Sequence, residues 1–364
     1  MLRTLTTLAF QNALALPHRR WRPRREAARE GYSILLPVPA DLPLFYRLAM
    51  ATLSRQTLRG ANEILVLPDA NIDAFRSLVA AGTPFELPLP VRCISSHPWR
   101  DALRRAVGRP HYNHFTQIVR GIDHATSQYL VLHDADLFLT EPDFLDRQHE
   151  IAAAGRLSLL GVDGAKDDWY RRNGFAHVAA TWELVFRSDW ARRFQPSELR
   201  SGTRSLGGRL GGHDTMLFAQ CRTAPDEIEW QTVEHGFVHF NYVICTYRDF
   251  LKVRRRFEDE RFIIPLLRLL IDGFDPDGPY PEIPAWSDIL RCLDGGSDRI
   301  LFPKPGADRG KYAELRDRLN ALCRSGFVPP DRAAVMEDRL RAFDRIYAPG
   351  RFERVAAPAI EAAA

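Results

Sequence analysis

The sequence contains few cysteines, and none of them has the spacing of metal-binding or redox-active cysteines. Zinc sites and disulfide scaffolds need cysteines in close pairs such as C-x-x-C, or in a dense set. Neither pattern occurs, so both classes are disfavoured, and we expect a cytoplasmic protein in a reducing compartment. The five cysteines are Cys93, Cys221, Cys245, Cys292 and Cys323.

The chain also lacks an apolar run long enough to cross a membrane. A spanning helix needs about 20 predominantly apolar residues, and the nearest run, Phe262–Ile271, is short and is interrupted by Pro265 and Arg268. The net charge is only +4, which gives no support to nucleic-acid binding. A length of 364 residues with 45% hydrophobic residues allows one large α/β domain with an extension, or two domains.

Residues 1–30 combine an amphipathic pattern with a basic cluster, His18–Arg25 (HRRWRPRR). A secretory signal carries its charge before its apolar part, so this order argues against one. Two interpretations remain open: peripheral contact with anionic lipid at the inner face of a membrane, or a leader helix packed on the domain. The apolar positions on one helical face are Leu2, Leu5, Ala9, Ala13 and Leu16.

Apolar runs alternate with segments of helical spacing over residues 32–234, which predicts an α/β fold with a mostly parallel sheet flanked by helices. The predicted strands are 32–38, 63–67, 91–94, the run before Asp134, 157–162, a run within 176–186, and 230–234. The predicted helices are 42–53, 72–81, 99–107, 113–125, 144–154, 189–194 and 215–221.

The character of the sequence changes at about Phe250, where charged helical segments and Pro-rich connections begin. We interpret this part as a helical extension and not as a second catalytic unit. The predicted organisation is therefore a leader at 1–30, an α/β domain at 31–249 and a helical C-terminal extension at 250–364.

The stretch with the clearest chemical character is 129–140, YLVLHDADLFLT. In an extended backbone Asp134 and Asp136, two residues apart, would point to the same side. Two carboxylates at the carboxyl end of a buried strand suit Mg²⁺ or Mn²⁺, which keep positions open for substrate phosphate oxygens. A second D-x-D, at 275–277, follows no predicted strand and is not expected to be a site.

A glycine-rich stretch, 201–212 (SGTRSLGGRLGG), leads into Asp214. Its composition predicts a mobile loop, which either closes over a ligand or only connects two elements. Asp214 could take a proton from a substrate, or it could cap the helix predicted to begin at Thr215. Three aromatic residues, Trp169, Tyr170 and Trp182, could stack on sugar faces or simply belong to the core.

Four features in this order resemble the GT-A glycosyltransferases, and most closely the inverting family 2 group. YSILLPV, which contains Pro37, resembles the first strand, and EILVLPDA resembles the strand ending at a base-contacting aspartate, here Asp69. GIDHATSQYLVLHDAD resembles the family's helix, strand and D-x-D, and GGHDTMLF resembles its E-D motif, with His213 in place of glutamate. The resemblance covers residues 32–239.

The resemblance implies a metal-dependent, inverting transfer of a sugar from a nucleotide-diphosphate donor to a hydroxyl of a saccharide or glycoconjugate acceptor, in polysaccharide or glycoconjugate assembly. Asp214 would be the catalytic base. The implied donor-binding residues are Pro37, Asp69, Arg120 and Asp134. The implied ligands of Mg²⁺ or Mn²⁺ are Asp136 and either His235, at the end of the predicted last strand, or His239.

Two other interpretations stay open. Haloacid-dehalogenase-type phosphatases also carry a D-x-D after a buried strand, but their motif continues with a small residue and Thr or Val near the start of the domain. Here Leu137 and Phe138 follow, well after the first strand. A GT-A-like fold without activity could instead serve as a scaffold in a glycan-assembly complex.

Overall fold

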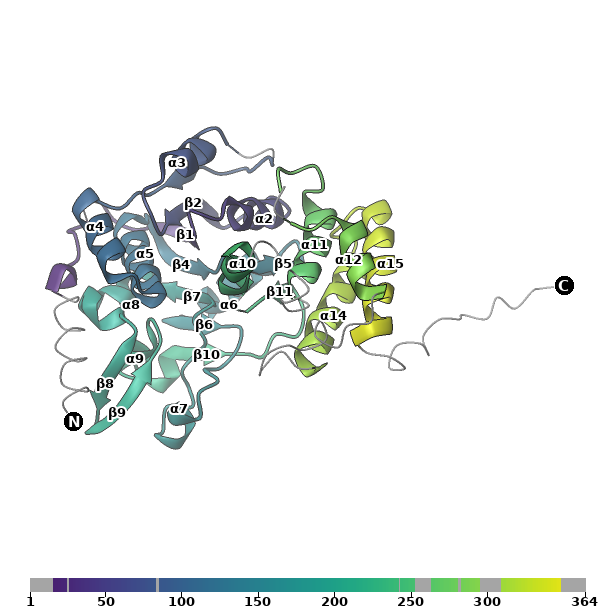
Figure 1. Cartoon of the computed structure of the whole chain (residues 1–364). Helices are drawn as coiled ribbons and strands as arrows, with labels where there is room; N and C mark the ends of the chain where they lie inside the picture. Colours follow the sequence, from purple (N-terminus) through teal and green to yellow (C-terminus); the bar gives the residue numbers. More distant parts are fainter. Residues whose placement is uncertain are drawn as a thin grey trace. The chain divides into compact units, whose positions relative to one another are not determined.

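The computed structural model describes residues 16–24, 26–82, 85–241, 243–252, 263–280, 283–294 and 309–347. The chain forms two compact units, shown with their elements in Figure 1. The first contains residues up to Leu137 together with Pro142–Glu234, and the second contains Phe138–Glu141 and the chain from His235 onward. The division therefore falls at 234/235, whereas the sequence suggested 249/250.

A seven-stranded sheet in the order β10-β6-β7-β4-β1-β2-β3 forms the centre of the first unit. Only β7 runs antiparallel to its neighbours within this sheet, which confirms the predicted α/β fold with a mostly parallel sheet. Its strands are β1 (Arg29–Val38), β2 (Ala61–Pro68), β3 (Val91–Cys93), β4 (Ser127–His133), β6 (Leu159–Gly161), β7 (Glu183–Arg187) and β10 (Ile228–Trp230).

The central strands β1 and β4 are apolar on both faces. Leu35 and Leu132, paired in the parallel register, belong to the core on one face, and the neighbouring pair Ile34 and Val131 points to the other face. All four side chains are fully buried. Helices that cover both faces of a parallel sheet account for this continuous apolar pattern.

Helix α5 (Pro110–His124) lies close against the sheet, with Ile118 and Ile122 in the same core as Leu35. Gly121 permits this approach, because a Cβ there would come within 2.8 Å of the Leu67 side chain. The other helices of the unit are α2 (Pro43–Leu53), α3 (Asp73–Ala80), α4 (Pro98–Val107), α6 (Phe144–Ala154), α7 (Asp168–Arg172), α8 (Ser188–Arg192) and α9 (Leu217–Gln220), with the 3₁₀ turns η1 (Leu16–His18), η2 (Pro196–Leu199) and η3 (Pro225–Glu227).

The glycine-rich stretch forms a β-hairpin, and the prediction of a loop there is wrong. Strand β8 (Gly202–Leu206) pairs antiparallel with β9 (Arg209–His213), and Figure 1 shows the two strands side by side. The connection is Gly207 and Gly208, whose φ angles are 57° and 79°. Two-residue hairpin turns with positive φ at both positions favour glycine, so the glycines here specify a turn and not mobility.

The N-terminal basic segment contacts the first unit where it is described. His18 is buried and packs edge-on against Phe115, with 5.1 Å between ring centroids. Trp21 donates from Nε1 to the carbonyl oxygen of Phe194 over 2.7 Å. These contacts agree with a leader packed on the domain. The predicted amphipathic helix lies outside the described residues apart from Leu16, and membrane contact stays a prediction.

The second unit contains a two-stranded sheet and a set of helices. Tyr312 and Arg316 both donate to the carboxylate of Asp344, over 3.1 Å and 3.0 Å, and so join α14 to α15. No helix in the described part of the chain is long and apolar enough to span a bilayer. The elements are β5 (Leu137–Leu139), β11 (Phe237–His239), α10 (Val243–Lys252), α11 (Ile263–Phe274), α12 (Trp286–Asp294), α14 (Arg309–Arg324) and α15 (Pro330–Tyr347).

Candidate active site

The order of strands reverses direction between β1 and β4. From β1 the chain continues to β2 and β3 on one side, and β4 then adds to the other side of β1. In open α/β sheets, ligands bind at such a switch point, outside the carboxyl ends of the strands. Asp134 directly follows β4 at that end, so the D-x-D occupies the position where a ligand is expected.

The D-x-D forms a tight turn, and the prediction of an extended backbone there is wrong. The amide of Leu137 donates to the carbonyl of Asp134 over 3.0 Å, which closes a four-residue turn. Strand β4 ends at His133, its last pair with β7, and aspartate is favoured at the first position of a turn. Asp134 and Asp136 both remain partly exposed, and Ala135 between them is buried.

Two histidines of α5, which the sequence analysis did not select, face the predicted aspartates. Nε2 of His114 lies 3.3 Å from a carboxylate oxygen of Asp134. One turn earlier, Nδ1 of His111 lies 3.9 Å from a carboxylate oxygen of Asp214. Residues three apart share a helix face, so α5 presents both imidazoles to the site. The i, i+3 spacing of the two histidines on a predicted helix was the sequence signal that could have identified them as site residues.

The pKa of His114 is influenced by all three predicted carboxylates. Burial disfavours the charged imidazole, but the carboxylates of Asp134, Asp214 and Asp136 together raise the pKa of His114 above its ordinary value. The contacts of 3.3 Å between His114 and Asp134 and of 3.9 Å between His111 and Asp214 place these carboxylates along one face of α5. The structure thus brings together three residues that the sequence separates by up to 80 positions (214 minus 134).

Asp214 does not cap a helix, so the capping interpretation is wrong. Helix α9 begins at Leu217, its N-cap is Met216, and no side chain caps it. The carboxylate of Asp214 instead accepts a hydrogen bond from the amide of Thr215 over 2.7 Å. Its side chain is 57% exposed, which leaves it accessible to a substrate. The role of base stays a prediction.

The aromatic residues Trp169 and Tyr170 support the hairpin. Nε1 of Trp169 donates to the carbonyl of Leu210 over 3.2 Å, and a Cβ at Gly211 would come within 2.6 Å of the indole ring. The hydroxyl of Tyr170 lies 3.2 Å from Nδ1 of His213. Burial lowers the pKa of His213, which favours the neutral imidazole. Both aromatic residues therefore hold the strand that ends before Asp214.

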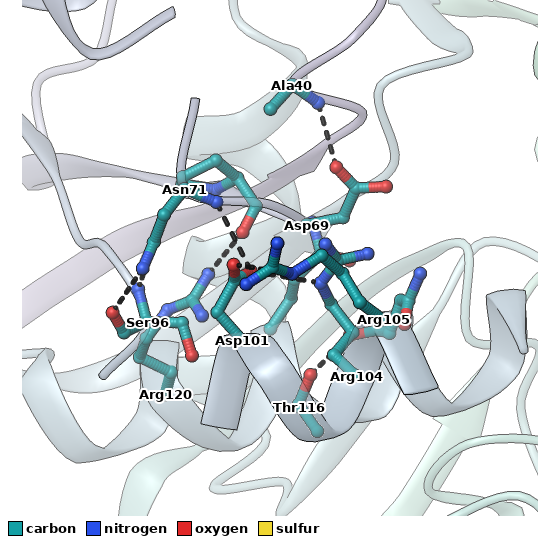
Figure 2. Close-up of polar contacts among 12 residues, drawn as sticks. Ala40, Asp69, Asn71, Ser96, Asp101, Arg104, Arg105, Thr116 and Arg120 are labelled. Atoms are coloured by element: carbon teal, nitrogen blue, oxygen red, sulfur yellow. Dashed lines mark hydrogen bonds and ion pairs between the residues drawn. The ribbon is translucent and has the colours of Figure 1, made fainter. Parts of the chain in front are cut away.

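A second polar cluster lies at the carboxyl ends of β1, β2 and β3 (Figure 2). Asp69, just past β2, accepts a hydrogen bond from the amide of Ala40 over 2.9 Å. Asn71 and Ser96 exchange two hydrogen bonds of 2.8 Å and 3.0 Å. The amide of Asn71 also donates to Asp101 over 3.3 Å. The Asp69 side chain is thus held by a backbone amide just past β2, and its contact with a nucleotide base stays a prediction.

Arg120 lies beneath these strand ends and is nine-tenths buried. Its Nη2 donates to the carbonyl of Pro68 over 2.6 Å, and its Nε has no hydrogen-bond partner among the described residues. Burial lowers the pKa of Arg120 to about 10, although Cys93 and Asp69 oppose this effect. Pro37 is buried within β1, paired with Leu67. Donor binding by Arg120 and Pro37 stays a prediction.

A buried histidine and glutamate directly precede the D-x-D. His133 and Glu183 are opposite each other on β4 and β7, with 2.7 Å between Nδ1 and Oε2. Their side chains are 0% and 2% exposed. Sequence reasoning missed this pair because polar residues in two strands give no sign that the strands are neighbours. The pair fixes the end of β4 from which Asp134 emerges.

The predicted metal ligands are not assembled as a cage. In the described ranges no three His, Cys, Asp or Glu side chains converge as metal ligands do. His235 is exposed and lies beyond β10, which ends at Trp230 and not at residue 234 as predicted. His235 and His239 belong to the second unit, and their role stays a prediction. Mg²⁺ commonly uses one or two carboxylates with substrate phosphates, so the donor set at Asp136 is compatible with a cation that enters with a donor.

No family model matches the chain, and no curated protein matches it. Among solved structures it is similar to the galactosyltransferase LgtC in complex with donor and acceptor sugar analogs, with 14% identity, 46% of this chain, 62% of that chain and a TM-score of 0.36. It is similar to S. aureus TarS in complex with UDP-GlcNAc, with 9% identity over 87% of this chain and 90% of that chain and a TM-score of 0.38. It is also similar to glucosyl-3-phosphoglycerate synthase from Mycobacterium tuberculosis, with 14% identity over 64% of this chain and 76% of that chain and a TM-score of 0.37. The match to LgtC covers less than two thirds of that protein's length.

Proposed function

We propose that this chain is a glycosyltransferase that moves a sugar from a nucleotide-diphosphate donor to an acceptor hydroxyl, with inversion at the anomeric carbon. The observation that carries the proposal is the position of the Asp134–Leu137 turn. It follows β4 beside the sheet's switch point, where Asp134 lies 3.3 Å from His114 and Asp214 lies 3.9 Å from His111 of the same helix. The order of motifs along the chain, which resembles GT-A enzymes, supports the same function.

In this proposal the donor lies along the carboxyl ends of the strands. Asp69 would contact the nucleotide base, Asp134 the ribose, and Arg120 a phosphate, while Pro37 would shape the end of β1. A divalent cation, Mg²⁺ or Mn²⁺, would be held by Asp136 together with oxygen atoms of the donor. It would supply neutralisation of the charge that develops on the departing diphosphate.

Asp214 would accept the proton of the acceptor hydroxyl. As that oxygen bonds to the anomeric carbon, the bond between this carbon and the diphosphate oxygen breaks, and the electron pair leaves with the nucleoside diphosphate. A carboxylate that accepts one backbone hydrogen bond and is more than half exposed can meet an incoming hydroxyl. Attack from the face opposite the leaving group accounts for inversion. We place the product in polysaccharide or glycoconjugate assembly.

The test is donor turnover by the purified full-length protein. It is incubated with UDP-, GDP- and ADP-linked sugars, with and without Mn²⁺, and released nucleoside diphosphate is measured. We expect Mn²⁺-dependent release that Asp136→Ala abolishes. Asp226→Ala, an exposed carboxylate in η3, is the matched control and should behave as wild type. Release of nucleoside diphosphate that depends neither on Mn²⁺ nor on Asp136 would contradict the proposal.

One observation favours an inactive GT-A-like scaffold as the second candidate. Asp134 already faces His114 at 3.3 Å, and no three-ligand cluster is formed among the described side chains. A scaffold would bind no donor, so calorimetry with nucleoside diphosphates in the presence of Mn²⁺ separates the two. Absence of binding to all of them would favour the scaffold.

A further inference from the structure

A cavity of about 440 Å³ opens beside Asp214. Its lining comes from residues 109–112 at the start of α5, 200–203 at the start of the hairpin, and 212–214 at the hairpin's end. All three segments belong to the first unit. None of the proposed donor-binding residues (Pro37, Asp69, Arg120 and Asp134) lines this cavity. The cavity is therefore available for a different group.

Arg200 places a buried positive charge among the residues that line the cavity. It is only 6% exposed, and burial lowers the pKa of its guanidinium. Its Nη1 donates to the carbonyl of Ser201 over 3.3 Å. Its Nε is buried without a hydrogen-bond partner, and among the described residues the one group that acts electrostatically on its charge is Tyr112, not a carboxylate. A buried cation without a counter-charge is costly, and an anionic ligand would remove that cost.

The start of α5 adds a second positive contribution. The helix has 15 residues, no acidic residue in its first turn and no side chain that caps it. Its N-terminal residues Pro110, His111 and Tyr112 line the cavity. The N-terminal end of a helix carries partial positive charge, which favours an anion. At this end Pro110 has no N–H and the amide of Tyr112 donates to the carbonyl of Arg109 over 3.1 Å, so the contribution is mainly electrostatic. This end and Arg200 thus act on the same space from two sides.

We propose that this cavity binds a phosphate group carried by the acceptor. The inference rests on the proposed glycosyltransferase function, because Asp214 is then the base that the acceptor must reach. Asp214 is the one carboxylate among the lining residues and lies at an exposed position. A phosphate against Arg200 would leave the acceptor hydroxyl to extend toward Asp214.

A phosphate fits the donors of this cavity better than a carboxylate does. The guanidinium of Arg200 and the hydroxyls of Ser201 and Thr203 supply several hydrogen-bond donors, and a phosphate group presents three acceptor oxygens to them where a carboxylate presents two. A soluble sugar phosphate and a lipid-linked phosphate share this chemistry. The experiment must therefore distinguish these two sources.

The test measures binding of phosphate compounds to the full-length protein by calorimetry. The probes are inorganic phosphate, glucose 6-phosphate, and phosphatidylcholine vesicles with or without phosphatidic acid. The cavity variants are Arg200→Gln and Arg109→Gln. Arg109 is exposed, so its substitution still tests the cavity if replacing the buried Arg200 prevents folding. Arg209→Gln is the matched control, because this arginine is exposed on the same hairpin but does not line the cavity.

We expect Arg200→Gln to weaken binding of phosphate compounds at least tenfold, Arg109→Gln to weaken it severalfold and Arg209→Gln to leave it unchanged. Affinity for nucleoside diphosphate should stay the same in all three. Binding of glucose 6-phosphate would identify a soluble acceptor, and binding only of vesicles with phosphatidic acid would identify a lipid-linked one.

Equal phosphate affinity in wild type and both cavity variants would overturn the inference, as would competition between phosphate and nucleoside diphosphate for one site. Failure of the proposed function has a different signature. In that case no variant binds a nucleoside diphosphate, while Arg200-dependent phosphate binding persists. That result would keep an anion site in the cavity and overturn its role as an acceptor site.

Discussion

Nε2 of His114 lies 3.3 Å from a carboxylate oxygen of Asp134. The pair joins α5 to the turn after β4, so the position of the D-x-D depends on a helix that the motif itself does not include. Because His111 faces Asp214 from the same helix, α5 connects the two ends of the candidate site.

The first prediction concerns the protonation of His114. Its pKa is raised by carboxylates against the effect of burial, so the charged imidazole is stabilised in the folded protein. This contribution is fully present below the ordinary histidine pKa and is lost as pH rises through the raised value. Asp134→Asn should lower the pKa of His114, measured by NMR titration of the imidazole. An unchanged titration would show that Asp134 does not set it.

The second prediction concerns Asp214. Asp214→Asn keeps the shape of the side chain and its contact with Thr215 but removes the base. We expect transfer to fall by 100-fold or more, a typical size for general-base catalysis, with donor affinity retained. Product formation by mass spectrometry and donor binding by calorimetry measure the two effects. Near-normal turnover would refute the assignment.

The third prediction concerns the buried pair His133 and Glu183. His133→Leu or Glu183→Leu alone leaves a polar group unpaired in the core and should lower the free energy of unfolding by about 3–5 kcal/mol. The double variant should cost clearly less than the sum, because it removes both partners. Urea unfolding of the four proteins provides the measurement. Additive losses would mean that the two residues do not act as a pair.

The fourth prediction compares two neighbouring glycines of the hairpin. A Cβ at Gly211 would come within 2.6 Å of the Trp169 indole, whereas a Cβ at Gly212 meets nothing within 4 Å. Gly211→Ala should therefore displace the ring and shift its fluorescence, at a cost of about 1–3 kcal/mol. Gly212→Ala serves as the control and should leave the spectrum unchanged. Similar spectra for both variants would argue against the contact.

The fifth prediction is a loss of stability at low pH caused by His18. Burial lowers its pKa to about 4, so the folded protein holds the neutral imidazole where the unfolded chain is already protonated. Stability is then lost as pH falls from about 6.5 toward 4, and between pH 7 and pH 5 the loss from this residue should be about 2 kcal/mol. His18→Leu should flatten this slope in denaturant unfolding. Parallel slopes would place the titration elsewhere.

Local sequence patterns predicted much of the first unit. The apolar run before Asp134 forms β4, and the segment predicted as a helix at 144–154 matches α6 at both ends. These predictions succeed because strand and helix periods are local properties of the chain. The prediction failed at 201–212, where composition was read as mobility although paired glycines also specify a hairpin turn.

The sequence by itself determined the α/β class and the position of the D-x-D after a buried strand, since burial on both faces leaves a continuous apolar run. Only the tertiary structure decided that His111 and His114 face Asp214 and Asp134, and that Arg200 lines a cavity without a counter-charge. These relationships join segments that are distant in the chain. Their physical cause is tertiary packing, which no local pattern encodes: α5 packs against the sheet and meets the turn after β4 and the end of the hairpin through its side chains.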